Sequence, residues 1–134
     1  MENVIESIRI DAKREKVAVV GENMNFTAER VAKFWPIYKG YEAEFTKVGD
    51  TFLGVIKDYA ANYEIMTDDK ASEFANELLR LQQVRPDLRK KYVGRLAKEL
   101  SPMIAARFLQ VDNRINLLID LELASRVPLI MDAQ

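Results

Sequence analysis

Apolar residues recur at alternating intervals of three and four positions between Val31 and Tyr59, and this pattern constrains the fold more than any other feature. The two sets of heptad positions are Val31, Tyr38, Phe45, Phe52 and Tyr59, and Phe34, Tyr41, Val48 and Val55. An α-helix places residues with this spacing on one face, and a run of about four heptads predicts a long helix that packs against another helix. The sequence therefore predicts an all-α protein built on long helices.

Two segments share a pattern that is typical of a helix start. Phe26-Thr27 precedes the heptad helix, and Leu100-Ser101 precedes the last apolar stretch. In both copies Ala, a cation and Phe follow five, six and seven positions after the hydroxyl residue. A Thr or Ser side chain at this position accepts a hydrogen bond from a free N–H group of the first helical turn. Thr67, which precedes two acidic residues, predicts a third start of the same kind.

These starts and the apolar periodicity predict helices over Val4–Val20, Ala28–Tyr63, Asp68–Glu99 and Pro102–Arg126. Pro36 and Pro86 fall inside two of them and are predicted to bend each helix without ending it. Because the connections are short, residues 25–128 are predicted to form an extended, bent helical hairpin within one domain, 1–134. Residues 1–21 are predicted either to pack as an N-terminal helix or to project as an arm.

An extended layer of helices exposes its apolar seam, and a homodimer that buries two such layers against each other is the simplest way to cover it. We therefore predict a homodimer. The last helix becomes apolar on almost all sides between Leu117 and Leu123. A helix of this kind is predicted to be covered on all sides.

Composition removes most catalytic chemistry from consideration. The chain has no Cys and no His, so it lacks disulfides, the usual zinc sites and any His-based general base. Adjacent carboxylates such as Asp68 and Asp69 point in different directions on a helix, whereas Asp112 and Asn116, four positions apart, can converge. We predict a protein that is not an enzyme and has no cofactor or metal. A net charge of −1 creates no field that would attract nucleic acid.

The apolar stretches are all too short to cross a bilayer, so the sequence predicts no membrane span. The first residues, from Met1 to Val4, carry neither the basic nor the apolar region of a signal peptide. Two interpretations remain open. The protein is cytoplasmic, or this is the mature form of an exported protein with an added initiator Met.

The repeated helix start resembles the LTxxQ motif of the Spy/CpxP superfamily of small periplasmic stress proteins. The copies read Phe26-Thr27-Ala28-Glu29-Arg30 and Leu100-Ser101-Pro102-Met103-Ile104, and neither has Gln at the fifth position. The resemblance covers about residues 25–128. It implies a bent helical hairpin, an antiparallel cradle-shaped homodimer, a periplasmic location and ATP-independent chaperone binding of unfolded or partly folded client proteins during a stress response. The alternative is an interaction module that binds one specific partner, such as an envelope-stress sensor domain.

The sequence offers four candidate residues for contact with a client or partner. Trp35 and Tyr63 lie beside the aromatic seam, and Arg89 and Arg95 belong to the basic stretch between Arg85 and Arg95. Aromatic side chains provide large contact areas at low entropic cost, and cations can meet acidic clients. The simpler interpretation is that the seam aromatics form the core and that the basic stretch is a solvated helix face.

Overall fold

The computed structural model describes residues 2–130, with side chains from residue 6 onward, and within that range it is all helical. Its elements are α1 (Glu2–Asn23), α2 (Ala28–Asn62), the short 3₁₀ turn η1 (Tyr63–Ile65), α3 (Asp68–Glu99) and α4 (Pro102–Arg126). The predicted all-α fold is confirmed. The predicted bounds of the last two helices coincide with those observed, whereas α1 extends beyond its predicted range at both ends.

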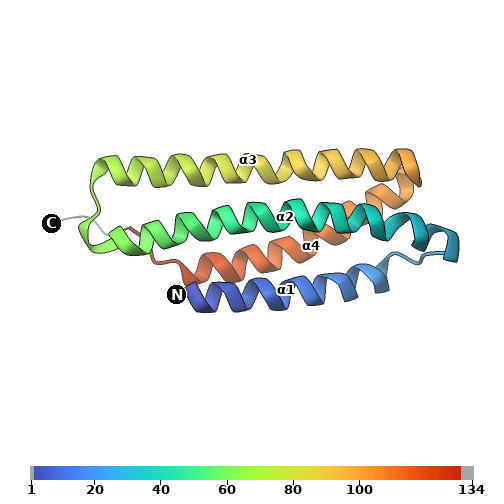
Figure 1. Ribbon diagram of the computed structural model, residues 1–134, viewed down its shortest axis with the longest axis horizontal. Helices are drawn as coiled ribbons and strands as arrows, with labels where there is room; N and C mark the ends of the chain where they lie inside the picture. The colour runs from blue at the N-terminus through green and yellow to red at the C-terminus, as the bar shows by residue number, and fades with distance from the viewer. Residues whose placement is uncertain (1, 131–134) are drawn as a thin grey trace.

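The four helices run antiparallel to one another in chain order and form an elongated four-helix bundle (Figure 1). The helix α2 packs on α1 and α3, and α4 packs on α3 and α1, so each helix has two neighbours and the ring is closed. Residues 25–128, predicted to form an extended hairpin, therefore supply three of the four helices of a closed bundle rather than an open layer. The N-terminal segment packs as a helix and does not project as an arm.

Hydroxyl side chains begin three of the helices, as their sequence context predicts. The side-chain oxygens of Thr27, Thr67 and Ser101 accept hydrogen bonds from the backbone N–H groups of Arg30, Lys70 and Ile104 at 3.4, 3.2 and 3.1 Å. Pro102 occupies the first turn of α4, where its missing N–H group costs nothing. Both interior prolines, Pro36 and Pro86, lie within unbroken helices.

An aromatic cluster fills the half of the core between the start of α2 and the end of α3. Phe34 and Tyr41 are fully buried, and the ring of Phe108 on α4 lies 6.0 Å from Phe34 and 5.5 Å from Tyr41. Leu88, Tyr92 and Leu96 of α3, Val20 of α1 and Met24, which follows α1, also belong to this cluster. The part of the seam formed by Phe34, Tyr38 and Tyr41 is thus covered within a single chain, so this part does not need a second copy to cover it.

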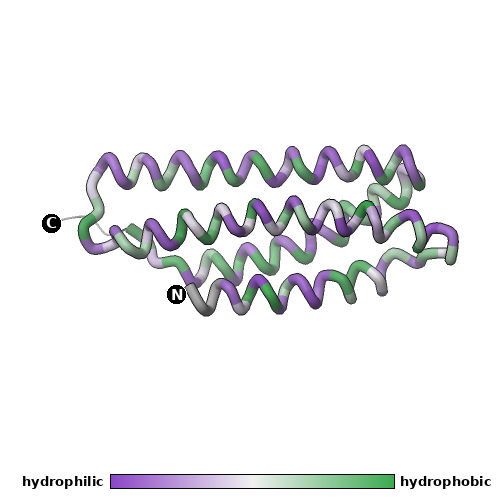
Figure 2. Tube along the Cα trace, in the orientation of Figure 1, coloured by the Kyte–Doolittle hydropathy of each residue, from purple (hydrophilic) through white to green (hydrophobic). Residues whose placement is uncertain are grey.

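The last helix is not covered on all sides, in contrast to the prediction. Leu117, Leu118 and Leu121 have exposed fractions of 70, 71 and 71 %. Figure 2 shows that apolar positions occupy much of the C-terminal half of α4, whereas polar positions dominate α3. Within the described range, no helix is both long and apolar enough to cross a membrane.

Candidate functional site

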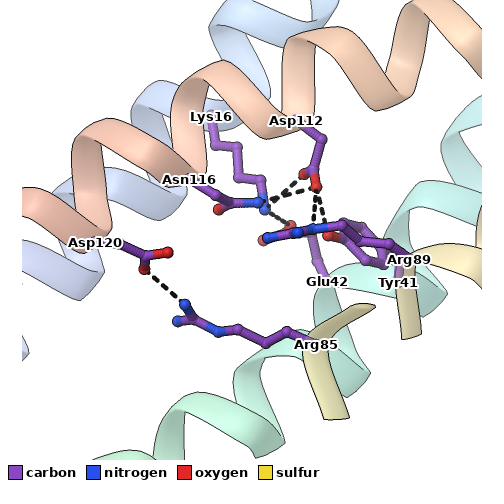
Figure 3. A network of polar contacts seen from close by, with 8 residues as sticks. All are labelled: Lys16, Tyr41, Glu42, Arg85, Arg89, Asp112, Asn116 and Asp120. Atoms are coloured by element: carbon purple, nitrogen blue, oxygen red, sulfur yellow. Dashed lines mark hydrogen bonds and ion pairs between the residues drawn. The ribbon is translucent and has the colours of Figure 1, made fainter. Parts of the chain in front are cut away.

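Charged side chains from all four helices meet inside the bundle (Figure 3). The group that we name the core charge cluster consists of Lys16, Tyr41, Glu42, Arg89, Asp112 and Asn116. Asp112 is its centre, because its carboxylate accepts hydrogen bonds from the Tyr41 hydroxyl at 2.7 Å and the Asn116 amide at 2.9 Å. The same carboxylate lies 3.2 Å from Lys16 Nζ and 3.3 Å from Arg89 Nε. Lys16 Nζ also lies 2.9 Å from Glu42 Oε1.

The core charge cluster is neutral as a whole, since the cations Lys16 and Arg89 oppose the carboxylates Glu42 and Asp112. The Asp112 side chain has an exposed fraction of 0 % and that of Lys16 only 3 %. Charges this deeply buried are stable only when they are paired and hydrogen-bonded. The cluster leaves no unpaired charge for a substrate, and its arrangement supports a structural role that fixes the four helices in register.

Two phenols in and beside the cluster, Tyr41 and Tyr38, have raised pKa values. Burial, followed by the charge of Asp112 and its hydrogen bond, raises the pKa of Tyr41 far above its ordinary value. Burial also raises the pKa of Tyr38, with Glu42 as the next cause. Among the described residues, no set of three or more Asp, Glu, His or Cys side chains is placed to hold a metal ion.

Sequence reasoning found only part of this cluster. The spacing of Asp112 and Asn116 indicated convergence, and the two side chains are indeed bonded to each other. The interpretation of Arg85 and Arg89 as part of a solvated face is wrong, because their side chains are only 22 and 21 % exposed and both pair with carboxylates of α4. The burial of Lys16 could not be predicted from the sequence, because a lone lysine in a helix ordinarily lies on the surface.

The structure does not bring the four candidate contact residues together. Trp35, near the start of α2, is half-buried, and its ring packs edge-on against Phe34 at 5.2 Å. Tyr63 lies just beyond the opposite end of α2, where its hydroxyl donates to the Leu129 carbonyl at 3.1 Å. Arg89 belongs to the core charge cluster, and the exposed Arg95 lies 3.7 Å from Glu99. These residues therefore do not form one continuous binding surface.

A cavity of about 720 Å³ opens between α2, α3 and α4 at the end of the bundle where α4 ends. We name it the apolar groove. Its walls are mainly aliphatic and aromatic side chains of the three helices and of the C-terminal segment: Val48, Phe52, Ile56, Tyr59, Phe74, Leu78, Leu81, Gln82, Arg85, Asp120, Leu123, Ala124, Val127, Pro128, Leu129 and Ile130. Such a volume lies in the range of about 300–1,000 Å³ that is typical of small-molecule sites.

The outer surface of α4 carries exposed leucines with a cation one turn before them. We name the set Arg114, Leu117, Leu118 and Leu121 the leucine face. Its spacing of three, four and seven positions places all four side chains on one side of the helix. Polar residues of α4, including Asp112 and Asn116, point into the bundle instead. The helix is therefore turned so that Asp112 and Asn116 face inward together with Phe108 and Leu123, whereas the three leucines of the leucine face point outward.

No family model, no curated protein and no solved structure matches this chain. The class of protein is thus defined by its own geometry: a closed four-helix bundle with a neutral charged core, an apolar groove and an exposed leucine face. Of these features, the leucine face is the one that projects from the surface, with three leucines about 70 % exposed.

Proposed function

We propose that this protein binds apolar segments of unfolded or partly folded proteins, without catalysis and without ATP, through the leucine face of α4. The main observation in support of this proposal is that the side chains of Leu117, Leu118 and Leu121 are each about 70 % exposed. This is the chaperone activity that the resemblance to the Spy/CpxP superfamily implies, and the periplasmic location belongs to the same proposal.

Energetics support a binding role for this surface. Full burial of a leucine side chain contributes about 1.5–3 kcal/mol relative to leaving it in water, so an exposed cluster is retained at a thermodynamic cost. Contiguous exposed apolar residues rimmed by polar ones are typical of protein interaction sites. Aliphatic contacts are not directional, and they suit clients that share hydrophobicity but not sequence.

The proposal is tested by light scattering of an unrelated unfolding protein, diluted into buffer with and without this protein. We expect the wild-type chain to suppress scattering at a near-equimolar ratio. Leu121→Ser should weaken suppression about tenfold, because one buried leucine contact corresponds to at least that factor. Leu79, on α3, is 62 % exposed and lies outside the leucine face, so Leu79→Ser is the matched control and should change nothing.

Both substitutions are at exposed positions and should leave the free energy of unfolding within about 0.5 kcal/mol of the wild-type value. Scattering that is unchanged by a tenfold excess of wild-type protein would overturn the proposal. So would equal loss of suppression in the two variants.

A second candidate function is binding of one dedicated partner, such as a sensor domain, and the positions of Arg107 and Arg114 favour it. These cations are seven positions apart on α4 and both are exposed, and neither forms an ion pair with another residue in the described part of the chain. Ion pairs between these two arginines and matching carboxylates would fix the position of a partner along α4.

Charge reversal separates the two candidates. In the double variant Arg107→Glu/Arg114→Glu, the affinity for a dedicated partner should fall tenfold or more. The suppression of light scattering by unrelated unfolded proteins should fall only slightly. Reversal at Arg89 would not serve this purpose, because it would place a second carboxylate against the buried Asp112.

The homodimer stays a prediction. If a second copy covers the leucine face, Leu121→Ser should lower the mass measured by sedimentation.

A further inference from the structure

We infer that the apolar groove is a second, separate site, which binds a single-chain amphiphile with an anionic head group. In this arrangement the apolar chain lies between α2, α3 and α4, and the head group contacts Arg85. The inference rests on the groove and on Arg85, and it is independent of the leucine face.

The groove has one charged region and an otherwise apolar wall. Phe52, Ile56 and Phe74 line its apolar part, and the ring of Phe74 stacks on Tyr59 at 4.3 Å between centroids. Arg85 and Asp120 supply the only charged side chains among the lining residues. A ligand that matches this wall has a long apolar part and a single charged end.

Arg85 has donors to spare for such a head group. Its Nη1 atom donates to Asp120 Oδ1 at 2.6 Å, and this is the one hydrogen bond that its guanidinium forms within the described chain (Figure 3). A guanidinium carries five N–H donors in a fixed fork. The guanidinium carbon also lies 5.1 Å above the ring of Phe45, so the side chain is already held in place. Arg85 can therefore bind a second anion while keeping Asp120.

A smaller hollow of about 190 Å³ shares Phe52, Arg85 and Leu123 with the apolar groove. Its walls include four cationic residues and three carboxylates: Arg9, Lys13, Lys16 and Arg85, and Glu6, Glu42 and Asp50. The other three cations equal the three carboxylates in number, and Arg85 itself is paired with Asp120, so the preference for an anionic head group rests on the unused N–H donors of Arg85 and not on net charge.

The C-terminal segment bounds the groove at the other end. The hydroxyls of Tyr59 and Tyr63 donate to the carbonyl oxygens of Pro128 at 2.6 Å and Leu129 at 3.1 Å. These bonds hold residues 127–130 against the cavity that they help to line. A groove bounded by this segment and by Arg85 suits a short amphiphile better than an extended polypeptide passing through it.

The test is a fluorescence titration with a dansyl-labelled medium-chain fatty acid, and with its uncharged methyl ester, below the concentration at which either forms micelles. We expect Arg85→Gln to weaken binding of the acid about tenfold, because a charge-assisted hydrogen bond is lost. Asp120→Asn should strengthen it, since a competing carboxylate is removed. Neither substitution should alter binding of the ester.

Ala124→Trp, which fills the groove from α4, should abolish binding of both probes, whereas Ala106→Trp, at an exposed site on the same helix outside the groove, should not. Leu121→Ser should leave probe binding unchanged, so failure of the leucine face and failure of this site are distinguishable. Absence of probe binding, or equal affinity for acid and ester with no effect of Arg85→Gln and Asp120→Asn, would overturn the inference.

Discussion

Asp112 and Lys16 show how individual residues set the register of this bundle. Each carboxylate oxygen of Asp112 has a cation within 3.3 Å, and its neighbours come from every helix of the bundle. A buried ion pair adds little to stability compared with an apolar pair, but removal of one partner leaves an unpaired buried charge. The core charge cluster therefore favours one alignment of the helices over any shifted alternative.

We predict that Asp112→Ala lowers the free energy of unfolding by about 3–5 kcal/mol, because Lys16 and Arg89 would then be buried with too few carboxylates. The matched control is Asp120→Ala, since the Asp120 side chain is 44 % exposed and faces a single arginine. Its cost should be about 1 kcal/mol or less. Urea denaturation followed by circular dichroism measures both. Equal effects in the two variants would contradict a structural role for the cluster.

At the scale of the helices, the local signals were sufficient to predict both boundaries of α3 and α4. Thr67 and Ser101 each accept the predicted hydrogen bond, and α3 and α4 begin at the next residue. The packing of α1 was not predictable in the same way. It depends on contacts of Lys16 and Arg9 with residues distant in sequence, such as the Arg9–Asp50 ion pair at 2.8 Å, and periodicity within a helix carries no information about such pairs.

Replacement of a capping hydroxyl tests the helix starts directly. Ser101→Ala should lower the free energy of unfolding by about 1 kcal/mol, because the Ile104 N–H group loses its acceptor. Ser72 is an exposed residue inside α3, so Ser72→Ala is the control and should be neutral or slightly stabilising, as alanine favours helix. Thermal melts compare the two. A neutral Ser101→Ala would mean that the cap does not contribute to stability.

At the scale of the whole molecule, α4 buries two polar residues, Asp112 and Asn116, and exposes three leucines. Sequence reasoning predicted four helices and an aromatic core, and Phe34, Tyr38 and Tyr41 are buried as the heptad pattern requires. It did not predict which side of α4 faces the core, because the apolar residues of that helix nearly surround it and give no single stripe. The burial of Asp112 and Asn116 decides the orientation and leaves Leu117, Leu118 and Leu121 on the surface.

The central claim is that the leucine face takes apolar segments of unfolded proteins, and a heteronuclear NMR titration tests it most directly. The isotope-labelled chain is titrated with a permanently unfolded, reduced and alkylated protein. We predict that amide shift changes concentrate on α4 from Arg114 to Leu121, and that Leu121→Ser requires about tenfold more unfolded protein to produce them whereas Leu79→Ser does not. Shift changes centred on the aromatic end around Trp35, or no changes on α4, would contradict the claim.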